Sequence, residues 1–338
     1  MKNEIKLAEK LRERGFFRES LKIWQKIYKD ALAHKDSYLV LDAAMCLGDL
    51  NRLLGNFGKA LTYYQEASEV AEVLQDKATL ADSLCGIALI KKAMAEWKEA
   101  LKLIKKARNI YLKNNDKKGL AFSYWAEATA LRVSGKIEKS IEYFLKAKTL
   151  FSKLKDKKGL GYSYCGLGGS FRVYGDFKKS MKYYVKANRI FKELKDSFGV
   201  AYSYCGIGNA FRVSGNFRKA EENFKKALRL YSKIGDIVSS SYTLWSMAML
   251  EIMKKEFNSA EEFIKKAYKN FKKCSDKRGL IYLMFLKAMI QYTKKRKTLA
   301  RSLFIRAASE AKRYELALEK KYAESFLKGR YQIPYNIP

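Results

Sequence analysis

The chain has 338 residues, of which 48% are hydrophobic and 31% are charged, and it contains only two prolines. This composition excludes a disordered chain and is typical of a folded protein with long helices. Because 69 lysines and arginines face only 35 acidic residues, the formal net charge is +34, and we expect an acidic partner.

The N-terminal segment, MKNEIKLAEKLRERG, is charged and amphipathic and lacks the apolar run of a signal peptide. No stretch approaches 18 uncharged apolar residues, so we expect a cytoplasmic protein without membrane insertion. His34 is the only histidine, which removes His-based metal sites and most Ser-His or Cys-His catalytic arrangements. We therefore expect a protein that is not an enzyme and that uses no cofactor and no metal.

A repeat of 40 residues runs through the sequence without an insertion. Residues 166–196, GLGGSFRVYGDFKKSMKYYVKANRIFKELKD, return at 206–236 as GIGNAFRVSGNFRKAEENFKKALRLYSKIGD. One position of the repeat is always small enough to let two helices approach closely. It is occupied by Gly48, Ala88, Ala128, Gly168, Gly208, Ala248 and Ala288.

Two further positions of the repeat predict where helices end and begin. The first favours the left-handed turn that ends a helix. It is occupied by Gly15, Gly55, Ala95, Gly135, Gly175, Gly215, Lys255 and Lys295. The second is an aspartate able to cap the first helix of the next unit. It is occupied by Asp36, Asp76, Asp116, Asp156, Asp196, Asp236 and Asp276. Each unit therefore contains two helices.

The order small, glycine, aromatic, small, small in Gly208, Gly215, Phe217, Ala220 and Ala227 closely resembles the tetratricopeptide repeat. The 40-residue period is similar to the longer-helix subtype of bacterial regulators and Pins-type adaptors. The resemblance implies an all-α fold, a helical-hairpin solenoid coiled as a right-handed superhelix, with about eight repeats and a C-terminal capping helix. The expected units are 1–36, 37–76, 77–116, 117–156, 157–196, 197–236, 237–276 and 277–310. We expect the capping helix at 311–329 and a flexible tail at 330–338.

The resemblance also implies that the first helix of each unit lines a concave groove. On the face of these helices away from the small residues, one position is cationic in six consecutive units. This cation column consists of Arg12, Arg52, Lys92, Arg132, Arg172 and Arg212. Guanidinium groups at regular spacing suit carboxylates or phosphates. The alternative is that the stems lie on apolar neighbours and the heads are solvated or paired.

Beside the cation column, Tyr162, Tyr202 and Tyr242 form a tyrosine column that predicts either a stacking surface or ordinary amphipathic packing. Asn209 lies on the same helix face as Tyr202 and Arg212. Together these residues predict a non-catalytic interaction scaffold that binds an acidic peptide or protein in the groove. The alternative function is binding of single-stranded RNA or DNA through the arginine and tyrosine positions.

The second helices are also basic, with six cations against a single acid, Glu193, between residues 177 and 193. The charge is spread over these helices, and a diffuse excess of lysine is ordinary for a solvated helix face. The sequence therefore predicts no separate binding role for the second helices.

Overall fold

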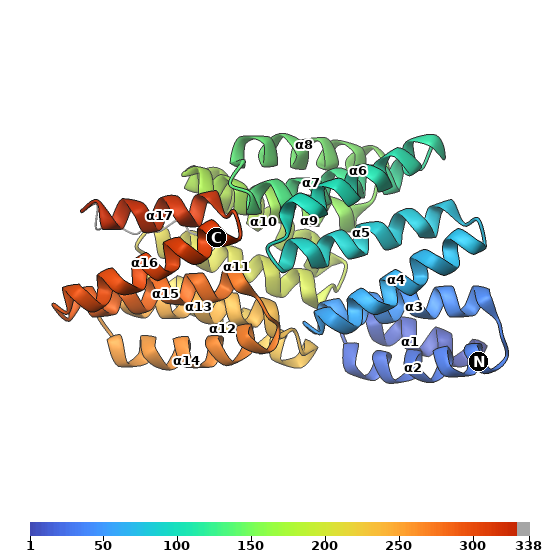
Figure 1. Cartoon of the computed structure of the whole chain (residues 1–338), viewed down its shortest axis with the longest axis horizontal. Coiled ribbons are helices and arrows are strands. Elements are labelled where there is room, and N and C mark those ends of the chain that lie inside the picture. The colour runs from blue at the N-terminus through green and yellow to red at the C-terminus, as the bar shows by residue number, and fades with distance from the viewer. Residues whose placement is uncertain (330–338) are drawn as a thin grey trace.

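Seventeen α-helices and no strand make up residues 1–329, the part of the chain that the computed structural model describes (Figure 1). Helices α1 to α16 form eight hairpins, and α17 follows the last one. Their bounds are α1 Lys2–Glu13, α2 Phe17–Ala33, α3 Ser37–Leu53, α4 Phe57–Val73, α5 Lys77–Ala93, α6 Trp97–Lys113, α7 Lys117–Val133, α8 Ile137–Lys153, α9 Lys157–Tyr174, α10 Phe177–Glu193, α11 Ser197–Val213, α12 Phe217–Ile234, α13 Ile237–Met253, α14 Phe257–Lys273, α15 Lys277–Thr293, α16 Lys297–Arg313 and α17 Ala317–Leu327.

The turn inside each hairpin has the predicted left-handed residue. At the first turn, Gly15 has φ +82°, its N–H donates to the carbonyl of Arg12, and Phe16 N–H donates to that of Leu11. This pattern satisfies carbonyls that the helix end leaves without partners. Ala95 and Lys255, which replace glycine, adopt the same conformation with φ of 71° and 67°. The fold therefore imposes the turn even where the residue opposes it.

The aspartates between units are helix caps, as predicted. Each accepts a hydrogen bond from the backbone N–H three residues later, at 2.8 to 3.0 Å. The pairs are Asp36 with Leu39, Asp76 with Thr79, Asp116 with Gly119, Asp156 with Gly159, Asp196 with Gly199, Asp236 with Ser239 and Asp276 with Gly279. An N-cap of this kind stabilises a helix by about 1 kcal/mol.

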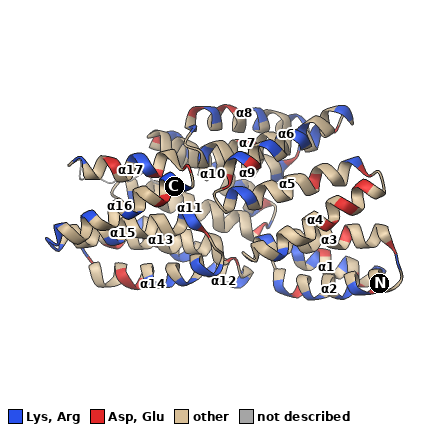
Figure 2. Ribbon diagram, in the orientation of Figure 1, with Lys and Arg blue, Asp and Glu red and all other residues tan. Residues whose placement is uncertain are grey.

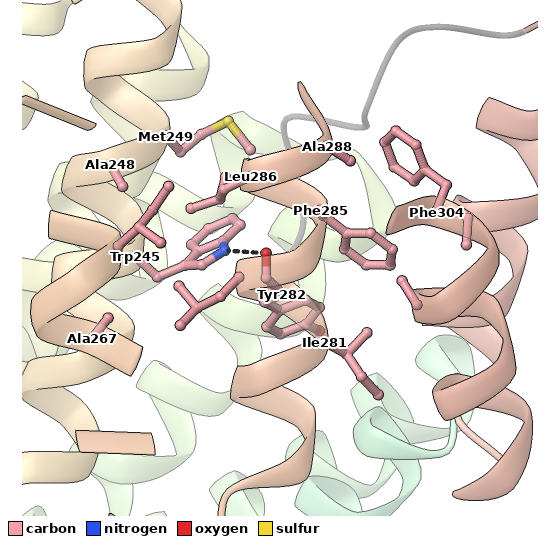
Figure 3. Packing of buried hydrophobic residues seen from close by; sticks show 14 of the residues in the cluster. Trp245, Ala248, Met249, Ala267, Ile281, Tyr282, Phe285, Leu286, Ala288 and Phe304 are labelled. Atoms are coloured by element: carbon pink, nitrogen blue, oxygen red, sulfur yellow. Dashed lines mark hydrogen bonds between the residues drawn. The ribbon is translucent and has the colours of Figure 1, made fainter. Parts of the chain in front are cut away.

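Large aromatic side chains of the first and second helices fill the space between hairpins. In its largest cluster, shown in Figure 3, the indole Nε1 of Trp245 donates to the carbonyl of Tyr282 at 3.2 Å. Phe285 and Phe304 stack with ring centroids 6.0 Å apart. No single unit could bury these rings alone, which explains why the repeats must stack.

The superhelix closes on itself, because hairpin turns of the first units touch units further along the chain. A Cβ on Gly55 would lie 2.9 Å from Cys274 Sγ and 3.0 Å from Ile237. The indole Nε1 of Trp97 donates to the carbonyl of Glu315 at 3.2 Å. Ala95 belongs to the same buried cluster as residues of α13 to α17. The inner face is therefore a narrow, partly enclosed space.

The segment 311–329, predicted as one capping helix, is divided in the structure. Its first residues end α16 at Arg313, and Glu315 with φ +52° forms the same turn that separates the other units. The separate helix α17 begins at Ala317, and its Phe326 ring stacks on Phe304 with centroids 3.6 Å apart. The predicted tail 330–338 lies outside the described residues.

Gly208→Leu is expected to destabilise the protein by about 1 to 3 kcal/mol, because a Cβ there would already lie 2.7 Å from the ring of Phe224. Phe224 is fully buried, so the two helices would have to separate. The measurement is the free energy of unfolding in urea. Gly58→Leu is the matched control, since nothing lies within 4 Å of a Cβ at Gly58. Equal stability of the two variants would show that the packing face is misassigned.

A candidate ligand-binding cavity on the inner face

A cavity of about 730 Å³ lies on the inner face of the first six units. First helices from α1 to α11 supply most of its wall, and Phe144 and Phe151 of α8 complete it. The lining combines cations with aromatic rings. It includes Arg12, Arg52, Lys92, Arg132, Lys158, Phe122, Trp125, Tyr162, Phe198 and Tyr202. Six of these residues belong to the predicted cation and tyrosine columns.

Arg12 and Arg52 share one carboxylate, that of Asp49. The Nη2 atoms of Arg12 and Arg52 lie 2.5 and 3.1 Å from Asp49, which also accepts a hydrogen bond from Tyr64 at 2.6 Å. Burial raises the pKa of Asp49, but the two guanidinium groups outweigh it and hold the pKa below its ordinary value. Asp49 is therefore ionised at neutral pH and compensates one of the two arginines.

Lys92 forms no ion pair with any carboxylate of residues 1–329. Burial lowers its pKa from 10.5 to about 8, and the positive charges of Arg132 and Arg52 act in the same direction. Arg278, at the start of α15, adds to this repulsion. The carboxylate of Asp276 acts on the pKa of Lys92 in the opposite direction but forms no ion pair with it, and at pH 7 most molecules carry an ammonium group here.

Among the cations that line the cavity, Arg132 is the second that forms no ion pair with a carboxylate of residues 1–329. Its Nη1 donates to the carbonyl of Gly166 at 3.4 Å, and its guanidinium lies 5.8 Å from the Phe144 ring centroid. Its Nε is buried without a hydrogen-bond partner among residues 1–329. Lys92 and Arg132 thus form a local excess of positive charge on the cavity wall.

Tyr162 and Tyr202 both line the cavity but make different contacts there. Tyr162 donates to the carboxylate of Asp196 at 3.1 Å, and burial together with that charge raises the pKa of the phenol well above its ordinary value. The ring of Tyr202 stacks on that of Phe198, with centroids 6.4 Å apart. Tyr162 is therefore fixed as part of the wall between two units.

The expectation that the whole cation column faces an open groove is wrong at Arg172 and Arg212. Their exposed fractions are only 5% and 0%, and neither lines the cavity. Arg212 donates from Nε and Nη2 to Asn209 Oδ1, and its guanidinium lies 5.9 Å from the Trp245 ring centroid. Residues of the following unit cover Arg212, whose Nη1 also lies 3.8 Å from Met253 Sδ, so this side chain acts in packing.

Asn209 and Tyr242 also lie outside the cavity lining. Asn209 is 5% exposed and donates to the carbonyl of Cys205. Tyr242 donates to Asp276 at 3.0 Å and its ring meets Phe271 edge-on at 4.9 Å. Two members of the tyrosine column, Tyr162 and Tyr242, therefore bind the aspartate that caps the first helix of the next unit.

Sequence reasoning missed Asp49, the acid that pairs with two members of the cation column. The available signal was its position three residues before Arg52, which places both side chains on one face of α3. Within residues 1–329, no group of three His, Cys, Asp or Glu side chains is placed to hold a metal ion. None of the described helices is long and apolar enough to cross a bilayer.

The family profile described as Tetratricopeptide repeat matches residues 39–113 and 201–234. The chain is a tetratricopeptide-repeat protein. These matches fall in the second, third and sixth units, whose capped helix pairs and left-handed turns are described above. No curated protein sequence gives a match.

Solved structures with the same fold span most of this tetratricopeptide-repeat chain. A Rap protein complexed with Competence and Sporulation Factor superimposes with a TM-score of 0.66 at 16% identity, covering 94% of this chain and 98% of that one. The Rap conjugation gene regulator of plasmid pLS20 in complex with the Phr* peptide gives 0.69 at 14% identity, covering 85% and 77%. Aspartyl phosphate phosphatase F from Bacillus subtilis gives 0.59 at 16% identity, covering 82% and 73%.

Proposed function

We propose that this protein is a non-catalytic interaction scaffold that binds an acidic segment of a partner protein in the inner cavity. The observation that carries the proposal is the pair Lys92 and Arg132, which line the cavity without a carboxylate partner among the described residues. An acidic side chain of a partner would supply the missing counter-charge.

The energetics favour a ligand with a carboxylate. A cation removed from water without a partner lowers stability, and the lowered pKa of Lys92 measures that cost. A carboxylate bound between Lys92 and Arg132 would recover much of it through charge-assisted hydrogen bonds, one of them to Arg132 Nε. The cavity therefore offers most to an anionic ligand.

The size and the walls of the cavity suit a short peptide. Its volume of about 730 Å³ lies within the range usual for ligand sites. Phe122, Trp125 and Tyr202 provide apolar surface for neighbouring side chains of the segment. Two of the structurally similar proteins are complexes with a factor or a peptide, which supports a peptide ligand here.

Single-stranded nucleic acid in the same groove has less support. That function needs arginines and tyrosines exposed over several consecutive units. Arg212 is fully buried, and Tyr242 is held by Asp276 and Phe271. The tyrosine column therefore offers no stacking position for a base after Tyr202.

Selection from a random pentapeptide library tests the proposal. The immobilised protein is expected to enrich peptides with one or two acidic residues, and Arg132→Gln should lower their affinity by at least about tenfold, because the variant loses a charged donor. Lys91→Gln is the control, since Lys91 lies next to the cavity lysine on α5 but pairs with Glu96 at 2.8 Å. Enrichment without acidic residues, or equal losses in both variants, would contradict the proposal.

A further inference from the structure

The outer helices carry a row of cations that repeats once in each of the third to eighth units. One position of the second helix is an exposed lysine or arginine in six consecutive units. This outer cation row consists of Lys106 in α6, Lys146 in α8, Lys186 in α10, Lys226 in α12, Lys266 in α14 and Arg306 in α16. Figure 2 shows blue segments on α6, α8, α12 and α14, the outer helices of four of these units. The charge is ordered and not merely diffuse.

On α10 the row has an energetic cost in the free protein, whereas on α8 its Lys146 pairs with Glu142 at 2.7 Å. On α10, Lys178, Lys182 and Lys186 follow one another at intervals of four, so three like charges lie one above the other on an exposed face. Like charges at this spacing destabilise a helix. Glu193 is the only acid within α10, and it pairs with Arg189. A polyanionic partner would turn this repulsion into attraction.

Aromatic rings accompany the row in three consecutive units. Tyr124, Tyr164 and Tyr204 occupy the same position in α7, α9 and α11, and all three are half-buried. Members of the row lie over two of these rings, Lys186 at 5.7 Å from the centroid of Tyr164 and Lys226 at 5.6 Å from that of Tyr204. The cation over Tyr124, at 4.5 Å, is Arg108, which lies outside the row and pairs with Glu127. Alternating cations and aromatic rings suit a ligand that alternates phosphates and flat bases.

The shape of the superhelix decides between polyanions. Turns of the early units contact units near the end of the array, as Trp97 does with Glu315, so the outer face is curved and not flat. A flat anionic surface such as a membrane would meet only a few members of the row at once. A flexible strand can follow the row from unit to unit.

We propose that the outer face of α8, α10 and α12 binds single-stranded nucleic acid. Phosphates contact Lys146, Lys186 and Lys226, and bases stack on Tyr164 and Tyr204 where the lysine side chains swing away. This site shares none of the cations that line the inner cavity. The test of this site is therefore independent of the test of peptide binding.

Fluorescence anisotropy with a labelled 30-nucleotide oligo(U) tests the site in the full chain. The triple variant Lys146→Gln, Lys186→Gln and Lys226→Gln is expected to bind at least about tenfold more weakly at about 0.1 M salt. Its plot of log affinity against log salt should flatten by about two, since each lost phosphate contact contributes about 0.7. The control variant carries Lys77→Gln, Lys117→Gln and Lys157→Gln, three exposed lysines at the starts of α5, α7 and α9.

The control should lose less than about threefold, because it removes the same charge without touching the row. Equal losses in the two variants, or no binding of oligo(U), would overturn the proposal. Polyphosphate of matched charge distinguishes stacking from charge alone without any substitution. We expect it to bind more weakly than oligo(U), whereas equal or tighter binding of polyphosphate, or of phosphatidylserine vesicles, would overturn the assignment to nucleic acid.

Discussion

Lys92→Met is expected to stabilise the folded protein at pH 7 by about 3 kcal/mol and to weaken binding of an acidic peptide. The folded-state pKa of Lys92 is about 8 against an ordinary 10.5, and each unit of difference corresponds to about 1.4 kcal/mol. Methionine retains much of the apolar stem without the charge. The gain in stability and the loss in affinity have one origin, which is a cation kept without a counter-charge.

The sign of the pH dependence follows from the lowered pKa. Between pH 8 and 10.5 the unfolded chain binds more protons at Lys92 than the folded chain, so stability at this site rises with pH. Below pH 8 the penalty is complete, and above 10.5 it is absent. Urea denaturation at pH 7 and pH 10 should show this rise in the wild type and not in Lys92→Met. Lys91→Met, which removes the neighbouring charge, should retain the rise, and a Lys92→Met profile parallel to the wild type would refute the assignment.

Glu319→Ala is expected to destabilise the protein by about 3 to 5 kcal/mol. Glu319 is fully buried at the start of α17, where Oε1 accepts from Arg278 Nε at 2.7 Å and from Tyr282 at 2.5 Å. Removing the carboxylate leaves the guanidinium of Arg278 buried without its counter-charge. Thermal and urea unfolding measure the loss, which should be accompanied by release of α17 from α15.

Two variants make this second prediction specific. Glu324→Ala breaks the exposed pair of Lys320 and Glu324 on the same helix, and it should cost less than about 1 kcal/mol. Combining Arg278→Met with Glu319→Leu removes both charges, and stability should recover most of the loss. A double variant as unstable as Glu319→Ala would show that packing at α17, rather than the uncompensated charge, is responsible.

The sequence predicts the fold in detail because its signals are local. Aspartate caps, left-handed turns and small contact positions each depend on residues within one unit or its neighbour, and the constant period repeats them. Gly208 against Phe224 is such a contact, readable from spacing alone. The start of α17 is displaced because Glu315 ends the last unit with the same turn as the others, although it is not a glycine.

The site was predicted less well, since periodicity gives the direction of a side chain but not what covers it. Lys92, Arg132 and Tyr202 line the cavity, whereas Arg212 at the equivalent position is buried. The difference depends on how tightly the superhelix winds, which is set by contacts between units that are far apart in the chain. Asp49 could not emerge from a comparison of repeats, because the next three units carry Leu89, Thr129 and Gly169 at its position.

The contact of early hairpin turns with late units has a consequence for cooperativity. An open array, in which each unit touches only its neighbours, can fray from either end one unit at a time. Here Trp97 is bonded to the backbone of Glu315, and Gly55 packs on Ile237, so the ends of the array are joined by contacts of high sequence separation. Such contacts slow folding, because a long loop must close before they form. These contacts also fix the number of units. Removal of one 40-residue repeat between the contacting units would shift the later units, so that Glu315 and Ile237 would no longer meet the turns at Trp97 and Gly55.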